Sequence, residues 1–250
     1  MIAITGAAGF IGSNLAHRLK GEESLLLVDQ LSPPEGCANF VGLETFPYVG
    51  HAEFLGQLES NRVRPDAIFH LGACSSTTET NWDYLRENNL EYTQRLWDWC
   101  AANGRPFIYA SSAATYGDGS KGFDDRTHPA ELVPLNLYGK SKNDFDIWAV
   151  AQERTPPRWA GLKFFNVYGP RESHKGRMAS VAFQTYNQIR ATGSMRLFRS
   201  THPAYPDGGQ LRDFVFVDDC VGHMIWLWKH AHDGGVFNSG TGTARSFSED

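Results

Sequence analysis

The chain has 250 residues and a formal net charge of −5 at pH 7, with 41% hydrophobic and 20% charged residues. These values are typical of a globular protein of one or two domains, and they exclude wholesale disorder. No basic run is present and no apolar stretch approaches the ~18 residues of a membrane span, which argues against a nucleic-acid surface and against an integral membrane protein. The first residues do not have the pattern of a signal peptide, so we expect a cytoplasmic protein.

Neither the cysteines nor the histidines have the spacing of a metal site. The nine histidines form no HExxH motif, so no metal ion is expected. The cysteines form no CxxC pair, and we expect them to be reduced thiols. They are Cys37, Cys74, Cys100 and Cys220.

The first thirty residues predict one βαβ unit. Residues 1–5 are apolar, as in a buried parallel strand, and a glycine loop over 6–12 follows at once. Residues 13–20 have the apolar spacing of a helix, and a second apolar strand over 25–28 leads to Asp29. Strand, loop, helix and strand in this order are typical of a nucleotide-binding fold.

Further strands and long helices alternate as far as residue 170. Because this alternation is typical of parallel sheets covered by helices on both faces, we predict an α/β fold with a Rossmann-type doubly wound parallel sheet. The expected strands are 66–71, 106–110 and 161–165, and the expected helices are 78–103 and 138–153.

The alternation changes after Gly169 and Pro170, which indicates a second unit. We expect one domain over 1–169 and a smaller C-terminal lobe over 170–250, with a return of residues near 214–240 to the first domain left open. The expected elements of this part are a helix over 180–192, a strand over 195–198, a loop over 200–209, a strand over 214–217 and a helix over 218–232.

The last residues have the pattern of a helix start. Ser246 or Ser248 would serve as the N-cap, with Glu249 and Asp250 in the first turn. Because no helix body follows, we expect the C-terminal lobe to be truncated.

The glycine loop predicts a dinucleotide site in the first domain. Gly6 allows the tight turn, Gly9 allows a pyrophosphate to approach the backbone, and Gly12 allows the helix to pack closely on the strand. Asp29 ends the second strand, where a carboxylate accepts hydrogen bonds from ribose hydroxyls. Residues 30–49 contain no Lys or Arg, so these residues by themselves favour NAD over NADP.

A second constellation predicts proton-transfer chemistry. Tyr138 and Lys142 are four residues apart on a predicted helix and therefore share one face. A nearby ammonium and a positive nicotinamide ring both favour the phenolate, so we expect Lys142 and this ring to lower the pKa of Tyr138, and Lys142 to hold the nicotinamide ribose. Ser112, at the end of a predicted strand, can hydrogen-bond the substrate oxygen that loses its proton.

The glycine motif and the Tyr-x-x-x-Lys motif resemble those of the extended short-chain dehydrogenases/reductases. Within that superfamily, the chain is most similar to the family of ADP-L-glycero-D-manno-heptose 6-epimerases. A His-Lys-Gly-x-Met-Ala-Ser-Val motif separates this family from other sugar-nucleotide epimerases. The similar segments are residues 69–79, 109–117, 137–142, 165–172 and 174–181.

The resemblance implies an isomerase for the lipopolysaccharide inner core. Members of this family oxidise C6″ of an ADP-heptose to a ketone with a tightly held NADP, and then return the hydride to the other face. Such an inversion needs proton-transfer groups on both faces, and the resemblance assigns these roles to Tyr138 and Lys175. It also implies a homo-oligomer.

The resemblance also assigns binding residues position by position. Asn39 and His51 stand where family members often carry basic residues, and Arg177 and Gln184 stand where some members carry Ser and His. Arg212 can hold a diphosphate bidentately, although a surface pair with Asp213 or Asp218 is an alternative. The implied cofactor contacts are Phe10, Ile11, Asp29, Gln30, Leu71, Gly72, Ala73, Cys74, Ser75, Asn88, Lys142 and Val167. The implied substrate contacts are Asn166, Arg177, Gln184, Phe198, Arg199, Ser200, Thr201 and Arg212.

Two alternatives to the heptose epimerase remain. A UDP-sugar 4-epimerase would use Ser112, Tyr138 and Lys142 but has no use for Lys175. A non-catalytic nucleotide-sensing module of the same fold would not need the Tyr138–Lys142 pair, which is present. A 4,6-dehydratase is disfavoured, because residues 111–117 lack the Asp-Glu pair that eliminates water.

Overall fold

The computed structural model describes residues 1–30, 38–197, 199–200, 203, 205–230 and 233–248. Its centre is a seven-stranded sheet with the strand order β10-β6-β5-β4-β1-β2-β3, and every neighbouring pair is parallel. This order, with helices on both faces, confirms the predicted Rossmann-type doubly wound fold. The strands are β1 (Ile2–Thr5), β2 (Leu25–Asp29), β3 (Tyr48–Gly50), β4 (Ala67–His70), β5 (Phe107–Ser112), β6 (Trp159–Phe164) and β10 (Gly235–Ser239).

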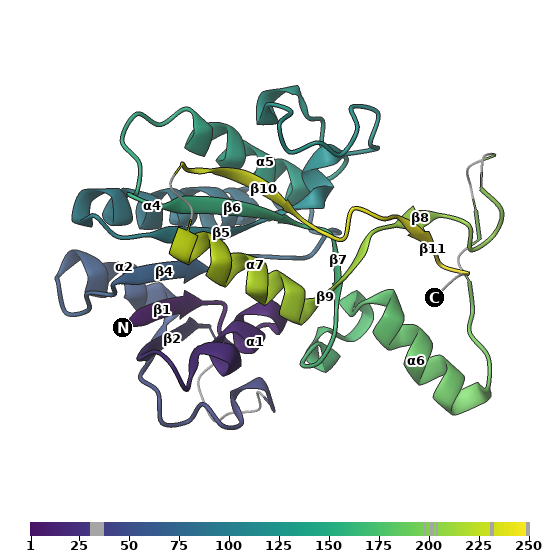
Figure 1. Cartoon of the computed structure of the whole chain (residues 1–250), viewed down its shortest axis with the longest axis horizontal. Helices are drawn as coiled ribbons and strands as arrows, with labels where there is room; N and C mark the ends of the chain where they lie inside the picture. Colours follow the sequence, from purple (N-terminus) through teal and green to yellow (C-terminus); the bar gives the residue numbers. More distant parts are fainter. Residues whose placement is uncertain (31–37, 198, 201–202, 204, 231–232, 249–250) are drawn as a thin grey trace.

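Helices cover both faces of this sheet (Figure 1). The main helices are α1 (Phe10–Leu19), α2 (His51–Glu59), α3 (Trp82–Leu85), α4 (Tyr92–Asn103), α5 (Leu137–Val150), α6 (Val181–Thr192) and α7 (Val217–His230). A π-helical segment, Arg86–Glu91, joins α3 to α4. Short 3₁₀ turns are Ala38–Phe40, Ala113–Tyr116, Pro129–Glu131 and Ser173–Met178.

The sheet separates two apolar clusters, because successive strand residues point to opposite faces. On one face, Ile2 and Ile4 of β1 pack in the same cluster as Leu15 of α1 and Met224 of α7. On the other face, Ala3 lies in the cluster that α2, α4 and α5 cover. That second cluster includes Phe54, Leu96, Trp97, Phe107 and Phe145.

Four short strands and α6 lie outside the seven-stranded sheet. β7 (Asn166–Tyr168) pairs in parallel with β9 (Phe214–Phe216), and β8 (Leu211–Arg212) pairs antiparallel with β11 (Arg245–Ser246). Figure 1 shows α6 and the β8–β11 pair beyond the end of the sheet, connected to it through β7 and β9. β10 brings residues 235–239 back into the sheet beside β6.

Several elements differ from the sequence prediction. Residues 195–197 form no strand, and the helix expected over 78–103 begins at Trp82 and contains the π segment. The prediction did not include β3 or α2. Both are short, and neither has a strong period or cap signal in the sequence.

Candidate active site

The glycine loop between β1 and α1 is built by close backbone contacts. Gly6 has φ +69°, and a Cβ there would lie 2.6 Å from the backbone nitrogen of Gly72. A Cβ on Gly12 would lie 2.1 Å from the carbonyl oxygen of Gly6, so only glycine lets α1 approach the loop. Around Gly9 such a Cβ meets only atoms of Gly6, the nearest at 3.0 Å, which leaves this part of the loop open.

The N-terminus of α1 fits the diphosphate of a dinucleotide. No side chain of the described residues caps this helix end, and its first turn contains no acidic residue. The uncapped backbone N–H groups and the helix dipole are therefore directed toward any anion bound at the glycine loop. Phe10 and Ile11, both predicted cofactor contacts, are the first two residues of this helix.

Asp29 ends β2 beside the glycine loop, as the sequence predicted. Its Oδ2 accepts a hydrogen bond from the backbone N–H of Ala8 at 2.8 Å, and its Oδ1 accepts one from the N–H of Gln30 at 2.7 Å. These bonds fix the carboxylate next to the loop, where it has further lone pairs for ribose hydroxyls. Burial lowers the pKa of the nearby His51 imidazole, although the charge of Asp29 opposes this shift.

The loop after β4 contains the predicted cofactor residues Leu71 to Ser75 and is held by buried polar groups. Asn89 receives a hydrogen bond from the N–H of Cys74 at 2.9 Å and donates one to the carbonyl of Cys74 at 3.0 Å. The N–H of Gly72 donates to Thr5 Oγ1 at 3.1 Å. Asn88, which the resemblance assigns to the cofactor, donates to the carbonyl of Tyr84 at 2.8 Å, and its cofactor contact stays a prediction.

His70, at the end of β4, completes this support and has one tautomer. Thr93 Oγ1 donates to the carbonyl of Asn89 at 2.7 Å, so it accepts from His70 Nε2 at 3.0 Å. Thr5 Oγ1 then donates to His70 Nδ1 at 2.7 Å. Burial lowers the pKa of His70 well below its ordinary value, which keeps the ring neutral.

The three predicted catalytic residues of the first domain come together at the N-terminus of α5. Asn136 caps this helix by accepting from the N–H of Gly139 at 2.7 Å, which fixes the turn that presents Tyr138. Ser112, at the end of β5, lies close enough to Tyr138 for its side chain to favour the phenolate of this tyrosine. Lys142, only 6% exposed, donates from Nζ to the carbonyl of Ala110 at 2.9 Å.

Burial dominates the electrostatics of this cluster. Burial raises the pKa of Tyr138 above 10.0, and the hydrogen bond with Ser112 opposes that shift. Burial also lowers the pKa of Lys142 to about 8, although the charge of Asp146 favours the ammonium. Desolvation is thus the largest influence on the Tyr138 pKa in the protein by itself, and the lowering of this pKa by Lys142 together with a bound nicotinamide ring stays a prediction.

Lys175 lies in the turn Ser173–Met178, which packs against the start of α1 next to the glycine loop. Its Nζ lies 5.6 Å from the centroid of the Phe10 ring, and burial lowers its pKa, a shift that Glu172 opposes. A lowered pKa makes the lysine a better proton donor than an exposed lysine. Lys175 thus lies at the helix end where the cofactor is expected.

The segment that carries Lys175 is anchored by Asn39. Its Nδ2 donates to the carbonyl of Ala8 at 2.9 Å and to the carbonyl of Arg171 at 3.1 Å, and Nδ1 of His174 lies 3.1 Å from the same nitrogen. Arg171 itself has φ +71°, which is rare outside glycine and marks a tightly constrained turn. Asn39 therefore ties this turn to the glycine loop at the position where family members often carry a lysine.

The predicted substrate residues lie around β7, β8 and α6. Asn166 donates to the carbonyl of Asp213 at 3.2 Å, and Val167 follows it in β7. Gln184 donates to the carbonyl of the exposed Arg177 at 3.0 Å. Ser200 donates its N–H to Asp207 at 2.6 Å, and the carbonyl of Arg199 accepts from Gln210 at 3.3 Å. Phe198 and Thr201 lie outside the described residues.

Arg212 is exposed and its guanidinium carbon lies 5.9 Å from the Phe247 ring. The surface ion pair considered from the sequence does not form with Asp213. The carboxylate of Asp213 instead accepts from the N–H groups of Thr241 and Gly242. Among the described residues Arg212 forms an ion pair with neither Asp213 nor Asp218, and its Nη1 donates to the carbonyl of Leu211 at 2.7 Å.

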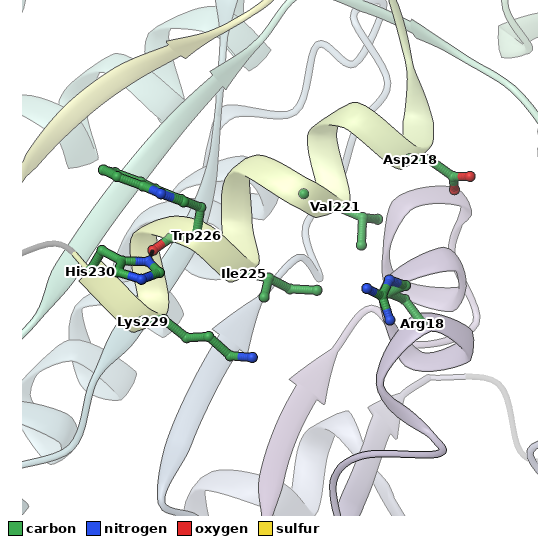
Figure 2. Close-up of a pocket in the computed structure, with 8 residues that line it drawn as sticks. Arg18, Asp218, Val221, Ile225, Trp226, Lys229 and His230 are labelled. Carbon is green, nitrogen blue, oxygen red and sulfur yellow. Dashed lines mark hydrogen bonds between the residues drawn. The ribbon is translucent and has the colours of Figure 1, made fainter.

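The structure also has a surface groove between α1 and α7, away from these residues. Figure 2 shows Arg18 of α1 facing Val221, Ile225 and Lys229 of α7 across it. It contains none of the predicted site residues, so we assign the site by its chemistry rather than by this groove. Within the described ranges, no helix is long and apolar enough to cross a membrane, and no three acidic, His or Cys side chains gather as metal ligands.

Residues 2–240 match the sequence model of the NAD dependent epimerase/dehydratase family. The chain is 50% identical over 254 residues to the ADP-L-glycero-D-manno-heptose-6-epimerase of Nitratidesulfovibrio vulgaris, an alignment that covers 100% of this chain and 78% of that protein. The solved ADP-L-glycero-D-manno-heptose-6-epimerase of Helicobacter pylori has a TM-score of 0.84 at 29% identity, over 99% of this chain and 78% of that one. The UDP-glucose 4-epimerase of Thermotoga maritima has a TM-score of 0.79 at 27% identity, over 99% and 79%.

Proposed function

The chain belongs to the NAD dependent epimerase/dehydratase family, and from that premise we propose that it converts ADP-D-glycero-D-manno-heptose to ADP-L-glycero-D-manno-heptose by inverting C6″. The product serves the lipopolysaccharide inner core. The observation that carries the proposal is the joint presence of the Ser112–Tyr138–Lys142 cluster and of Lys175 beside the glycine loop. A nicotinamide dinucleotide, when bound, accepts a hydride from C6″ and returns it.

The residues of the chain divide the remaining work. Gly6, Gly9 and the N-terminus of α1 hold the diphosphate, and Asp29 holds the adenosine ribose. Tyr138 takes the proton of the C6″ hydroxyl on one face while Ser112 orients that oxygen. After the ketone has rotated to present its other face, Lys175 donates a proton to the C6″ oxygen as this carbon is reduced again. Asn166 and Arg212 bind the substrate, with Arg212 on its diphosphate.

The test of this function is conversion without added cofactor. The purified protein is expected to convert ADP-D-glycero-D-manno-heptose to the L-glycero epimer, detected by nuclear magnetic resonance of the heptose. Turnover of UDP-glucose, with the ADP-heptose unchanged, would instead identify a UDP-sugar 4-epimerase. Binding of nucleotide sugars with no conversion would identify the sensing module and contradict the proposal.

For the dinucleotide we propose NADP, which the family resemblance implies. Two imidazoles near Asp29 support it, because the ring N–H groups of His51 and His174 can donate hydrogen bonds to a 2′-phosphate, although burial lowers the pKa of both rings. NAD is the alternative, because the carboxylate of Asp29 itself repels a 2′-phosphate. Mass spectrometry of the dinucleotide released by denaturing the purified protein is expected to give NADP, and the mass of NAD would overturn this choice.

The homo-oligomer, the cytoplasmic location and the division of the chain at residue 169 stay predictions. They come from the resemblance and from the sequence pattern.

A further inference from the structure

A buried ion pair lies on the same face of α5 as Tyr138 and Lys142, farther along the helix. Tyr138, Lys142 and Asp146 are spaced four residues apart and share that face of the helix. The carboxylate of Asp146 is 2.8 Å from the ammonium of Lys163 on β6, and the two side chains are 0% and 1% exposed. Sequence reasoning assigned neither residue to the site.

Hydrogen bonds connect the pair to the strand that ends at Ser112. Asp146 accepts from the hydroxyl of Tyr109 at 2.9 Å and from that of Ser111 at 2.6 Å. Lys163 also donates to Thr115 Oγ1 at 2.7 Å, and the Thr115 hydroxyl in turn donates to the carbonyl of Ser112 at 2.8 Å. The pair therefore joins α5, which carries Asp146, to the backbone of Ser112, which Lys163 reaches through Thr115.

Residues of β5 and β6 leave room for this hydrogen-bond network. Ser111 and Lys163 are register partners in the β5–β6 ladder, so both side chains point to the α5 face. A Cβ on Gly161 would lie 2.3 Å from the ring of Tyr109, so the glycine leaves room for the ring that reaches Asp146.

Stability alone does not account for such a pair. Removing two charges from water is costly, and replacing a buried ion pair by apolar residues is often neutral or stabilising. A charge pair in this position instead acts on the neighbouring groups whose protonation matters.

We propose that Asp146 and Lys163 are positioning residues, which hold Ser112 and α5 together and set the electrostatic potential at the Tyr138 hydroxyl. This inference rests on the proposed role of Tyr138 as the proton acceptor. The negative charge of Asp146 opposes the phenolate, and the positive charge of Lys163 favours it.

The other titratable groups near Tyr138 and Lys142 come from β4 and the loop after it. His70 is held neutral by burial, and Cys74 contributes a thiol. Asp146 raises the pKa of both Tyr138 and Lys142, and Lys163 is its counter-charge. Changing one member of the pair at a time therefore changes the local charge with a defined sign.

The experiment measures the acidic limb of the pH profile of kcat/KM in the holoenzyme. Asp146→Asn keeps acceptors for Tyr109 and removes a negative charge, so the limb is expected to move to lower pH by roughly one unit. Lys163→Gln keeps hydrogen bonds to Thr115 and removes a positive charge, so the limb is expected to move to higher pH by a similar amount. The double variant is expected to return to within a few tenths of a unit of the wild-type limb.

The matched control is Asp144→Asn, which removes the same charge from the same helix. Asp144 pairs with Lys140 at the surface, where solvent screens charges. The acidic limb of the kcat/KM profile of Asp144→Asn is therefore expected to stay at the wild-type pH. Thermal unfolding and bound-dinucleotide content verify that each variant is folded. Limbs that stay at the wild-type position in both single variants, or that move in the same direction, would overturn the proposal.

A second readout separates this inference from the proposed function. Ultraviolet absorbance of the phenolate, compared between each variant and its Tyr138→Phe counterpart, gives the titration of Tyr138 without turnover. Opposite shifts in a protein that does not epimerise the ADP-heptose would support the pair and contradict the function. Epimerisation with no shift in either single variant would support the function and contradict the pair.

Discussion

Tyr138→Phe is expected to lower the rate of ADP-heptose epimerisation by roughly a thousandfold, within the range that general acid–base groups contribute. The variant loses the hydroxyl that would take the C6″ proton, whereas the ring at the start of α5 is kept. We therefore expect the melting temperature and the dinucleotide content to stay close to those of the wild type. Steady-state kinetics on the purified variant check the loss.

Tyr186→Phe is the matched control for this variant. Tyr186 lies on α6 with 58% of its surface exposed, and its hydroxyl receives only a long 3.5 Å contact from Arg190. Removing this hydroxyl is expected to leave the rate unchanged. A Tyr138→Phe enzyme that works at the wild-type rate would show that the phenol does not transfer the proton.

Lys175→Met is expected to lower epimerisation by about a hundredfold or more, because the second face of the sugar loses its proton-transfer group. Methionine keeps the length of the side chain against Phe10, and the turn stays tied to the glycine loop through Asn39. The dinucleotide should therefore stay bound. The measurement is the rate of epimer formation together with the dinucleotide content.

Lys121→Met serves as the control for the loss of a lysine, because Lys121 is exposed in the loop after β5. Its rate is expected to equal that of the wild type. Wild-type epimerisation by Lys175→Met would remove the two-base account and would leave Tyr138 to act on both faces.

The βα units and the glycine loop could be predicted because their signals are local. Apolar runs, glycine spacing and the terminal Asp29 are properties of neighbouring residues, and all lie in the structure where the pattern put them. The Tyr138–Lys142 spacing was readable for the same reason, since four residues make about one helical turn. The burial that raises the pKa of Tyr138 was not readable, because desolvation depends on the packing of the whole site.

The polar groups that support the site could not be found in this way. Asn89 binds the loop after β4 from the π segment Arg86–Glu91, where the helix is wider than an α-helix and the spacing of its inward side chains is not the α-helical one. Lys163 lies in a strand that is otherwise apolar, and its partner Asp146 is on a helix. Only the packing of α5 on β5 and β6 shows that these two charges meet.

The most direct test of the central claim, a transient oxidation at C6″ with return of the same hydride, uses substrate that carries deuterium at that carbon. The protein is incubated with this ADP-D-glycero-D-manno-heptose in ordinary water without added cofactor, and the product is analysed by nuclear magnetic resonance and mass spectrometry. We expect ADP-L-glycero-D-manno-heptose that retains deuterium at C6″, because the hydride never leaves the site. Product that carries protium at C6″ would contradict the account.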